Sequence, residues 1–255
     1  MIRTLLCLWL LAPLLVTAAE PAGTAHPDDP WESFNRKIFA FNETVDRYLL
    51  KPAAKGYRWI TPGWLDDRFT NVFQNARDVP SAINHSLQWQ WRRAGHSTGR
   101  VLLNSTIGIG GLFNVASKAG LEKHSSDLGL TLARWGVPSG PYLVVPGMGP
   151  STLRDAAMLW PDDYLSPRHY IEPDEVRWGV TALYVVDLRA DLLDAERAIV
   201  GDRYSFLREF YLSSRRMAAG EQIEDDFGAG FEEGDWGDDD GWGEDDDAWG
   251  DAPAP

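Results

Sequence analysis

The sequence contains a single cysteine, Cys7, which lies inside an apolar run close to the N-terminus. The rest of the chain therefore offers no disulfide, thiol nucleophile or thiolate metal site. A cysteine that accepts a lipid is expected at the end of such a run, behind small residues, and Cys7 comes too early. The sequence thus gives little support for a covalent lipid anchor.

A second long apolar run is also missing. Leu5–Val16 is shorter than the roughly 20 residues that span a bilayer, and Arg3 precedes it. Small residues follow up to Ala19, as they do at the cleavage site of a signal peptide. We therefore predict an exported protein in which residues 1–19 are a signal peptide and residues 20–28 a flexible segment. An uncleaved membrane anchor is the alternative.

Basic side chains are absent from residue 221 to the C-terminus, where 15 of the 38 acidic residues lie. This segment accounts for the net charge of −14, and the remainder of the chain is nearly neutral. Its dense like charge and its glycines leave too little apolar surface to offset the entropy of ordering. Residues 221–255 are therefore predicted to be a disordered acidic tail. The alternative is a docking strip in which spaced tryptophans bind a basic partner.

Catalytic motifs are missing as well. The five histidines are scattered, and no nucleophile elbow, zinc-protease helix or phosphate-binding loop is present. The nearest candidate is His124-Ser125-Ser126-Asp127, but neighbours in a loop rarely place a base on a hydroxyl, so a polar loop is the simpler interpretation. A nearly neutral, exported body also argues against nucleic-acid binding. We predict no enzyme, no cofactor and no metal site.

The clearest structural signal is an amphipathic helix at the start of the body. Asp28-Asp29-Pro30 offers a cap followed by a proline at the first helical position. Asn35 and Asn42 lie one heptad apart beside the apolar stripe, where they can bond to backbone or line a polar seam. The helix is predicted to end by Pro52. Its stripe has spacings of three and four and consists of Trp31, Phe34, Ile38, Phe41, Val45 and Tyr48.

The rest of the body is also predicted to be mainly α. Gln88–Arg93 interleaves tryptophan with arginine, which indicates either a helix start or a belt at a membrane interface. Apolar spacing and capping signals predict further helices over residues 52–60, 62–79, 81–87, 151–160, 173–200 and 204–219.

The segment Val101–Ala116 carries no charge over 16 positions, which is too short for a normal spanning helix. Its glycines, Gly108, Gly110 and Gly111, would let helices approach closely in lipid, or would bend or break a helix in water. They do not make a dinucleotide-binding fingerprint, because no βαβ unit surrounds them.

Two short extended arms are predicted around a turn further along the chain. Thr131–Trp135 and Tyr142–Val145 flank residues 136–141, whose glycines and prolines are typical of turns. The sequence therefore predicts a hairpin-like loop from 131 to 145.

Four separated motifs, taken in order, resemble those of the VacJ/MlaA family. The similarity extends from about Pro27 to Ala219 and leaves out the acidic tail. Several motifs in the right order are far more specific than any one of them. They are Asp29-Pro30-Trp31-Glu32-Ser33-Phe34-Asn35-Arg36, Leu103-Asn104-Ser105-Thr106-Ile107-Gly108-Ile109-Gly110-Gly111, Gly140-Pro141-Tyr142 and Ser151-Thr152-Leu153-Arg154-Asp155.

The resemblance implies an outer-membrane protein of Gram-negative bacteria, on the periplasmic side. Residues 29–220 would form a mainly α domain in which amphipathic helices make a membrane-embedded ring with a central channel. Phospholipids misplaced in the outer leaflet would pass through it toward a periplasmic lipid-carrier protein of the Mla system, and the ring would associate with trimeric porins. An envelope structural or adhesion protein that binds through the acidic tail is the alternative.

The resemblance also implies roles for individual residues. Pro138 stands where the family hairpin has a glycine, and a proline would stiffen a gate. The missing lipid-accepting cysteine is a second departure. By motif position, the lipid channel falls on Phe34, Asn35, Ile38, Phe39, Phe41 and Asn42, the gating hairpin on Gly136, Pro138, Gly140, Pro141 and Tyr142, and the glycine-rich membrane segment on Gly108, Gly110 and Gly111.

Overall fold

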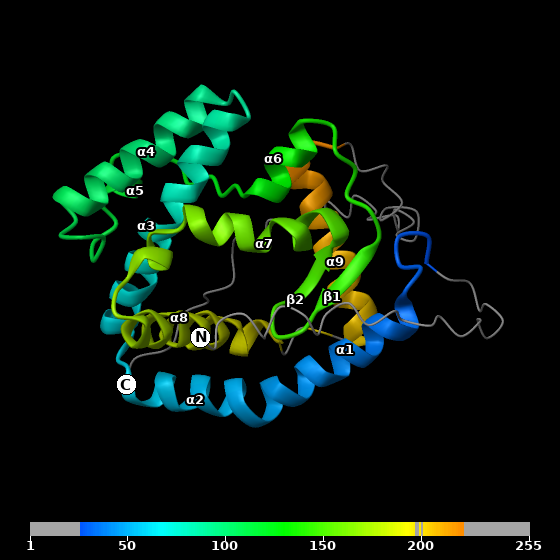
Figure 1. Cartoon of the computed structure of the whole chain (residues 1–255). Coiled ribbons are helices and arrows are strands. Elements are labelled where there is room, and N and C mark those ends of the chain that lie inside the picture. The colour runs from blue at the N-terminus through cyan, green and yellow to red at the C-terminus, as the bar shows by residue number, and fades with distance from the viewer. Residues whose placement is uncertain (1–25, 197–198, 200, 222–255) are drawn as a thin grey trace, which may run out of the picture.

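The computed structural model describes residues 26–196, 199 and 201–221. The predicted signal peptide, residues 20–25 and the acidic tail beyond residue 221 lie outside the described residues. Within them the chain is mainly helical, as predicted, with a two-stranded antiparallel sheet (Figure 1). The elements are α1 (Glu32–Val45), a π-helical turn (Asp46–Leu50), α2 (Lys51–Ile60), α3 (Gly63–Leu87), α4 (Trp91–Thr106), α5 (Val115–Lys118), α6 (Leu128–Arg134), β1 (Tyr142–Val145), β2 (Gly149–Thr152), α7 (Leu153–Leu165), a 3-10 turn (Pro167–Tyr170), α8 (Asp174–Ala195) and α9 (Arg203–Ala219).

The first helix continues past its predicted end. α1, the π-helical turn and α2 follow one another without an extended residue, and Lys51 has helical dihedral angles, φ −64° and ψ −43°. Pro52 lies in the first turn of α2, where a missing N–H is best tolerated. The predicted end at Pro52 is therefore wrong, and the helical segment runs to Ile60.

α3 also runs through a proline. A helix end near Val79–Pro80 was predicted, but α3 is continuous to Leu87. The Ser81 hydroxyl donates to the Arg77 carbonyl at 2.9 Å, and the Asn84 amide donates to the Pro80 carbonyl at 3.0 Å. These side-chain bonds and the packing of α3 against α4 stabilise the helix across a residue that has no N–H to donate.

The strand pair differs from the predicted hairpin. β1 pairs with β2, so that Tyr142 lies opposite Thr152 and Val145 opposite Gly149, and Thr131–Trp135 is not a strand. Gly147 adopts φ +74° and Gly149 φ +96°, values that suit glycine and allow the tight turn between the strands. The hairpin therefore turns about residues 146–148 rather than 136–141.

The predicted first arm of that hairpin is instead α6. The Asp127 carboxylate accepts a hydrogen bond from the Leu130 N–H at 2.8 Å and caps the helix. Leu130 and Thr131 are buried, whereas Arg134 and Trp135 are exposed. A short apolar run of this length fits a strand or a helix equally well, and the cap decides between them.

The later helices agree more closely with prediction. α9 begins one residue before the predicted start and ends where predicted, and α8 ends at Ala195 rather than near residue 200. α7 begins at Leu153 with Thr152 as its cap, and it continues through Pro161 to Leu165. Predicting its end at Trp160 was therefore five residues short.

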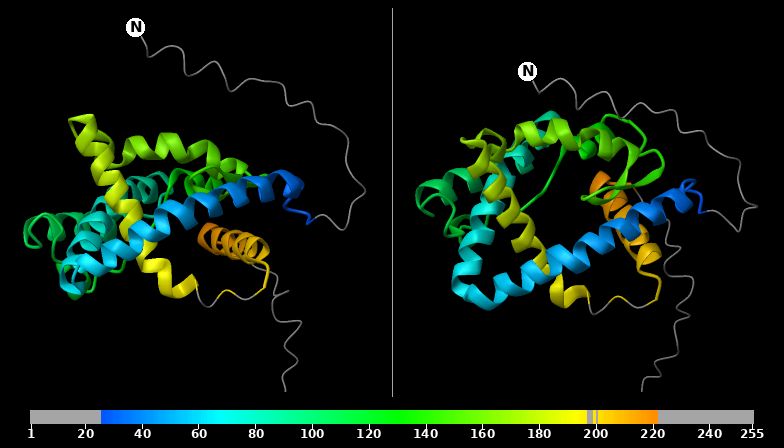
Figure 2. Two further views of the ribbon diagram at one scale, coloured as in Figure 1. Left: turned by 90° about the horizontal axis from the view of Figure 1, so that it is seen from below. Right: turned by 60° about the horizontal axis from the view of Figure 1, so that its bottom comes forward.

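The main helices lie along the sides of a closed outline and do not surround a single central core (Figure 2). In the right-hand view of Figure 2, α1 and α2 (blue) form the lower side, α3 (cyan) the left, α7 (green) the top, and the hairpin with α9 (orange) the right. Seven of the ten buried apolar residues in the described part of the chain form two separate small clusters. One joins β1 and α9 through Tyr142, Val144, Tyr204 and Leu212, and the other joins α2 and α8 through Ala54, Tyr57 and Ala190.

Apolar and polar side chains are distributed in the reverse of the usual pattern. In the described part of the chain, ten hydrophobic residues are buried, against 19 polar or charged ones, while 32 large hydrophobic residues are exposed. Every tryptophan in this part is exposed, from 44% for Trp31 to 88% for Trp59. No helix among the described residues combines the length and apolar character needed to cross a membrane. Such an extensive apolar exterior indicates contact with a membrane or with partner proteins.

Candidate functional site

Two asparagines of α1 hold the β-hairpin. The Asn35 carboxamide donates to the Tyr142 carbonyl at 3.1 Å and accepts from the Val144 N–H at 3.0 Å. Asn42, two turns later on the same face, donates to the Val145 carbonyl at 3.0 Å and accepts from the Gly147 N–H at 2.8 Å. Each carboxamide thus offers the hairpin backbone one donor and one acceptor, as a neighbouring strand would. Of the two alternatives for these asparagines, the structure favours bonding to backbone.

Asn35 is fully buried, and the groups behind it connect α1 to α9. Its amide also donates to Asp29, a buried carboxylate, at 2.8 Å. The same carboxylate accepts from the Tyr204 hydroxyl and, at 3.2 Å, from Arg208. α1, the hairpin and α9 are therefore joined by a buried polar network. Asn35 was predicted to line a channel, but it is a member of this network and presents no surface to a ligand.

We expect Asn42→Ala to lower the free energy of unfolding by about 1–2 kcal/mol, because it removes two net-stabilising hydrogen bonds to the hairpin. Thr44→Ala, at an exposed position of the same helix, is the matched control and should have almost no effect. Denaturant unfolding in mild detergent, followed by tryptophan fluorescence, measures both. Equal stability of Asn42→Ala and wild type would mean that these bonds do not hold the hairpin.

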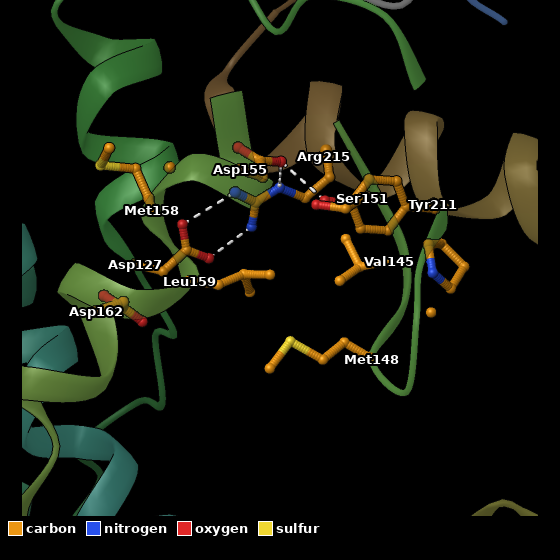
Figure 3. Close-up of a pocket in the computed structure, with 13 residues that line it drawn as sticks. Asp127, Val145, Met148, Ser151, Asp155, Met158, Leu159, Asp162, Tyr211 and Arg215 are labelled. Carbon is orange, nitrogen blue, oxygen red and sulfur yellow. Dashed lines mark hydrogen bonds and ion pairs between the residues drawn. The ribbon is translucent and has the colours of Figure 1, made fainter. Parts of the chain in front are cut away.

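A cavity of about 210 Å³ lies between the hairpin, α6, α7 and α9 (Figure 3). Figure 3 shows Asp155 and Arg215 along one side and Val145, Leu159 and Met148 on the other. The cavity therefore has a charged wall and an apolar wall. Such a lining suits part of an amphipathic molecule, and the volume is below the range of sites that enclose a whole drug-sized ligand.

Arg215 organises the charged wall. Its two terminal nitrogens bind the two carboxylate oxygens of Asp127 at 2.6 and 2.9 Å, and its Nε donates to Asp155 at 2.9 Å. The Tyr211 hydroxyl donates to Asp155 at 2.8 Å. Burial alone would raise the pKa of Asp155, but the charge and hydrogen bonds of Arg215 hold it below its ordinary value. A bidentate arginine–carboxylate pair of this kind fixes the geometry of α6 against α9.

Asp162, on α7, is the third carboxylate of the wall. It accepts hydrogen bonds from the Leu128 N–H at 3.1 Å and from Asn84 at 3.5 Å. Burial raises its pKa, and the nearby negative charge of Asp127 acts in the same direction. No cationic side chain is among the hydrogen-bond donors to Asp162 within the described residues, so it is the carboxylate of the wall most able to meet a positive group of a ligand.

A glycine lets α6 approach this wall. A Cβ atom on Gly129 would lie 2.4 Å from the Asp155 carboxylate and 2.8 Å from the Arg215 guanidinium. Any larger residue would therefore displace the ion-paired groups. Gly129 is the second residue of α6, two positions after the Asp127 cap, and it is buried.

The predicted gating residues lie in an exposed loop between α6 and β1. Gly136 and Gly140 adopt φ +90° and +68°, and residues 134–140 are all exposed. The loop is bound to the start of α7, where Arg154 donates to the Val137 carbonyl at 3.2 Å and its backbone N–H donates to the Ser139 carbonyl at 3.1 Å. Tyr142, at the end of the loop, is fully buried in the core and is not part of its exposed surface.

The three predicted membrane-segment glycines reverse the chain after α4. Gly108 is buried, and a Cβ there would lie 2.3 Å from the Phe113 carbonyl oxygen. Gly110 and Gly111 have φ +68° and +95°. The helix ends at Thr106, as expected if these glycines break it. The reversal carries an exposed apolar tip formed by Ile107, Ile109, Leu112 and Phe113.

The remaining predicted channel residues of α1 divide into two groups. Ile38 and Phe39 are partly buried and pack against the cluster around Tyr142. Phe34 and Phe41 are 46% and 55% exposed, and their spacing of seven places them on one face of the helix. Phe34 and Phe41 are therefore the apolar side chains of this set that remain free for a ligand.

The loop considered as a hydrolase candidate does not form a catalytic triad. The Nε2 atom of His124 lies 3.3 Å from Glu122, not near Asp127. Asp127 is engaged by Arg215 and by the cap of α6. The hydroxyl of Ser126 accepts a hydrogen bond from Gln88 at 2.7 Å. The geometry therefore favours the polar loop over the nucleophilic site.

The charged wall of the cavity was not predicted from sequence. Its members, Asp127, Asp155, Asp162 and Arg215, lie in three separate parts of the chain. Arg154-Asp155 belonged to a recognised motif, but no spacing signal connects it to Arg215. Only the packing of α6, α7 and α9 brings them together.

Comparisons with known proteins agree with the sequence motifs. Residues 27–218 match the family model described as MlaA lipoprotein. The intermembrane phospholipid transport system lipoprotein MlaA of Escherichia coli is 30% identical over 219 residues, which cover 82% of this chain and 86% of that protein. The protein of the same name from Haemophilus influenzae is 32% identical over 144 residues, covering 52% and 58%.

Two further matches bear on coverage and fold. An uncharacterized protein of Rickettsia typhi is 40% identical over 156 residues, which are 61% of this chain and 62% of the relative, so the match spans less than two thirds of that protein. A solved structure described as the structural basis for maintenance of bacterial outer membrane lipid asymmetry superposes with a TM-score of 0.66 and 32% identity. It covers 75% of this chain and 98% of that one.

Proposed function

The chain belongs to the MlaA lipoprotein family, and from this we propose that it transports phospholipids, removing those misplaced in the outer leaflet of the outer membrane. The E. coli relative is named for an intermembrane phospholipid transport system, and the similar solved structure concerns outer-membrane lipid asymmetry. The protein acts without making or breaking covalent bonds in this proposal, so no catalytic residue is assigned.

The observation that carries the proposal is the reversed distribution of side chains. A protein that lies in lipid gains nothing from burying apolar groups against one another, whereas its polar groups must be satisfied internally. Nineteen buried polar residues and 32 exposed large hydrophobic ones fit that requirement. The exposed tryptophans fit the interface between hydrocarbon and head groups, which indole rings prefer. This supports a body embedded in the membrane.

The proposed path is a ring of helices with a channel through it. The arrangement of α1–α2, α3, α7 and α9 around the outline in Figure 2 supports the ring. A lipid has apolar chains and an ionic head, so its path needs both kinds of wall. On α1, the row of Phe34 and Phe41 would contact the chains, while Asn35 and Asn42 hold the neighbouring hairpin in place.

The cavity beside the hairpin would receive the head group. Its volume of about 210 Å³ suits one end of a lipid, and its two walls suit the junction of head and chain. Asp162 would face a cationic group such as the ammonium of a zwitterionic head, while Val145, Met148 and Leu159 contact apolar atoms. The loop of residues 135–141 would act as the gate, stiffened by Pro138 and by its bonds to Arg154.

The proposed partners are those that the resemblance to the family implies. We propose that the protein lies on the periplasmic side of the outer membrane, associates with trimeric porins there, and passes lipid to a periplasmic carrier of the Mla system. The exposed apolar tip at residues 107–113 and the faces of α2 and α8 supply surface for such contacts.

Phe41→Asp tests the lipid path. Because Phe41 is 55% exposed, the variant should fold, but a charge in the path should block the acyl chains. Outer-leaflet phospholipid in cells that carry this variant alone should rise toward the level of a deletion strain. The readout is labelling of surface-accessible phospholipid in intact cells, with protein level checked by immunoblot.

Ser33→Asp is the matched control, since it adds the same charge to an exposed position of α1 outside the Phe34–Phe41 row. It should leave the outer leaflet at the wild-type level. Ile38→Asp should instead lose folded protein, because Ile38 packs against the buried cluster. If folded Phe41→Asp supports normal asymmetry, the α1 path is wrong, and an envelope structural role with these aromatics as packing surface gains support.

A further inference from the structure

Two histidines and a glutamate come together away from the cavity. His96 lies on α4, while Glu122 and His124 lie in the segment between α5 and α6. One ligand atom from each residue falls within 4.8 Å of the others. We infer that this cluster binds a divalent transition-metal ion such as Zn²⁺.

The distances fit a metal centre after a small adjustment. Zinc holds imidazole nitrogen and carboxylate oxygen at about 2.0–2.2 Å, so two ligand atoms of a tetrahedral site lie about 3.3–3.5 Å apart. The Nε2 atom of His124 and the carboxylate of Glu122 are already 3.3 Å apart. The His96 and His124 rings stack with centroids 5.8 Å apart and an interplanar angle of 25°. The third ligand atom, from His96, lies within 4.8 Å of the other two, so a shift of at most about 1.5 Å closes the set to tetrahedral distances.

An independent observation points to a missing partner. The Nδ1 atom of His96 is buried and has no hydrogen-bond partner in the structure. Buried ring nitrogens are almost always paired with a donor, an acceptor or a metal. His124 is itself positioned from behind, because a ring nitrogen of the buried His85 lies 3.3 Å from its carbonyl oxygen. The cluster therefore has one unsatisfied imidazole and one that is held in place.

The ligand types select the class of ion. Two imidazoles and one carboxylate suit zinc, copper or nickel, whereas magnesium and calcium prefer oxygen ligands throughout. Three protein ligands would leave a fourth position for water. Sequence reasoning predicted no metal site, because the spacing of 26 and two residues between these three positions matches no familiar motif.

A bound ion would tie the α5–α6 segment to α4. That segment leads directly to Asp127, which caps α6 and binds Arg215 in the cavity wall. The metal would thus restrain the segment that positions Asp127 in the cavity wall. This inference does not depend on lipid transport, because the ligands, their distances and the orphaned nitrogen are independent of what the cavity holds.

Isothermal titration of ZnCl₂ into the untagged, EDTA-treated mature protein in mild detergent tests the site. We expect one zinc ion to bind in the micromolar range or tighter, and His96→Ala and His124→Ala to weaken binding at least about tenfold. His169→Ala, which alters a histidine paired with Asp163 elsewhere in the fold, is the control and should bind as wild type does.

Glu122→Gln guards against a variant that fails to fold, since the Glu122 side chain is 69% exposed. It should also weaken binding while circular dichroism stays unchanged. Carboxylates of the acidic C-terminal segment are present in all variants, so differences between them report the cluster alone. Zinc binding that is equally tight in wild type and in the His96→Ala/His124→Ala double variant, or no binding by the wild type, would overturn the inference.

Discussion

Replacing Arg100 with methionine should lower the free energy of unfolding by about 3–5 kcal/mol, the cost of leaving a buried charge without its partner. Arg100 and Asp78 are each 1% exposed and lie 2.9 Å apart, joining α4 to α3. Arg100 also donates to the Ser117 hydroxyl and the Leu121 carbonyl, both at 3.0 Å, so its loss frees α5 and the segment after it. Denaturant unfolding in mild detergent at pH 7.5 measures the effect.

The pH dependence of that variant distinguishes charge from packing. Burial raises the pKa of Asp78, and without Arg100 it should rise further. When folding raises the pKa of a carboxyl, the free energy of unfolding of the protein falls as the pH rises through that value. Arg100→Met should therefore be less destabilised at pH 5 than at pH 8. Arg77→Met, an exposed neighbour of Asp78 on α3, is the control and should cost almost nothing. A loss for Arg100→Met that is small and independent of pH would contradict the buried ion pair.

The second large effect is expected at the cavity wall. Arg215→Met should lower the free energy of unfolding by about 2–3 kcal/mol, because it removes charged hydrogen bonds to Asp127 and Asp155. The Asp155 carboxylate, which is buried, then keeps its charge without the hydrogen bond from Arg215. It should also raise outer-leaflet phospholipid in cells, since the wall against α6 is no longer fixed. Stability and surface-accessible phospholipid are measured on the same variant.

The sign of the acid dependence provides a check on Arg215→Met. In the wild type the pKa of Asp155 lies below its ordinary value of 3.8, so this stabilisation is present above pH 3.8 and is lost as the pH falls through the lowered pKa. The variant should show a smaller acid-dependent loss, because only Tyr211 and Arg154 then remain to lower the pKa of Asp155. Arg216→Met, whose side chain is 44% exposed, is the matched control on the same helix. If Arg215→Met unfolds with the wild-type acid profile, Arg215 is not the group that depresses the pKa.

The sequence predicted the helical class and an amphipathic first helix, and the structure confirms both. The predicted start at Pro30 behind a cap at Asp28-Asp29 is wrong, because α1 begins at Glu32 and its N-cap residue, Trp31, makes no side-chain cap bond. The stripe from Trp31 to Tyr48 predicted one apolar face of the helix. In the structure, Ile38 of this stripe packs against the cluster beside the hairpin, while Phe34 and Phe41 are exposed. Motif order identified the family, because independent motifs in one order are hard to reproduce by chance. The channel and gate residues stay predictions, apart from Asn35, whose burial is explained by its bonds to the hairpin.

One of the remaining features has a local signal, the cap at Asp127, and the others depend on tertiary contacts that no local pattern encodes. Leu128–Arg134 is too short for its period to separate helix from strand, and the Asp127 cap decides the outcome. Pro80 and Pro161 would end isolated helices, yet packing and side-chain bonds carry α3 and α7 through them. The cavity and the histidine cluster join residues dozens of positions apart, so their partners became visible only when the helices were packed.

The most direct test of the account is the amount of phospholipid in the outer leaflet of cells that lack this protein. Surface labelling of intact cells, before and after deletion of the gene and after its return, measures that amount. Lipid transport predicts that outer-leaflet phospholipid rises on deletion and returns to the wild-type level with the intact chain. An outer leaflet that is unchanged by the deletion, in cells shown to lack the protein, would contradict the proposed function.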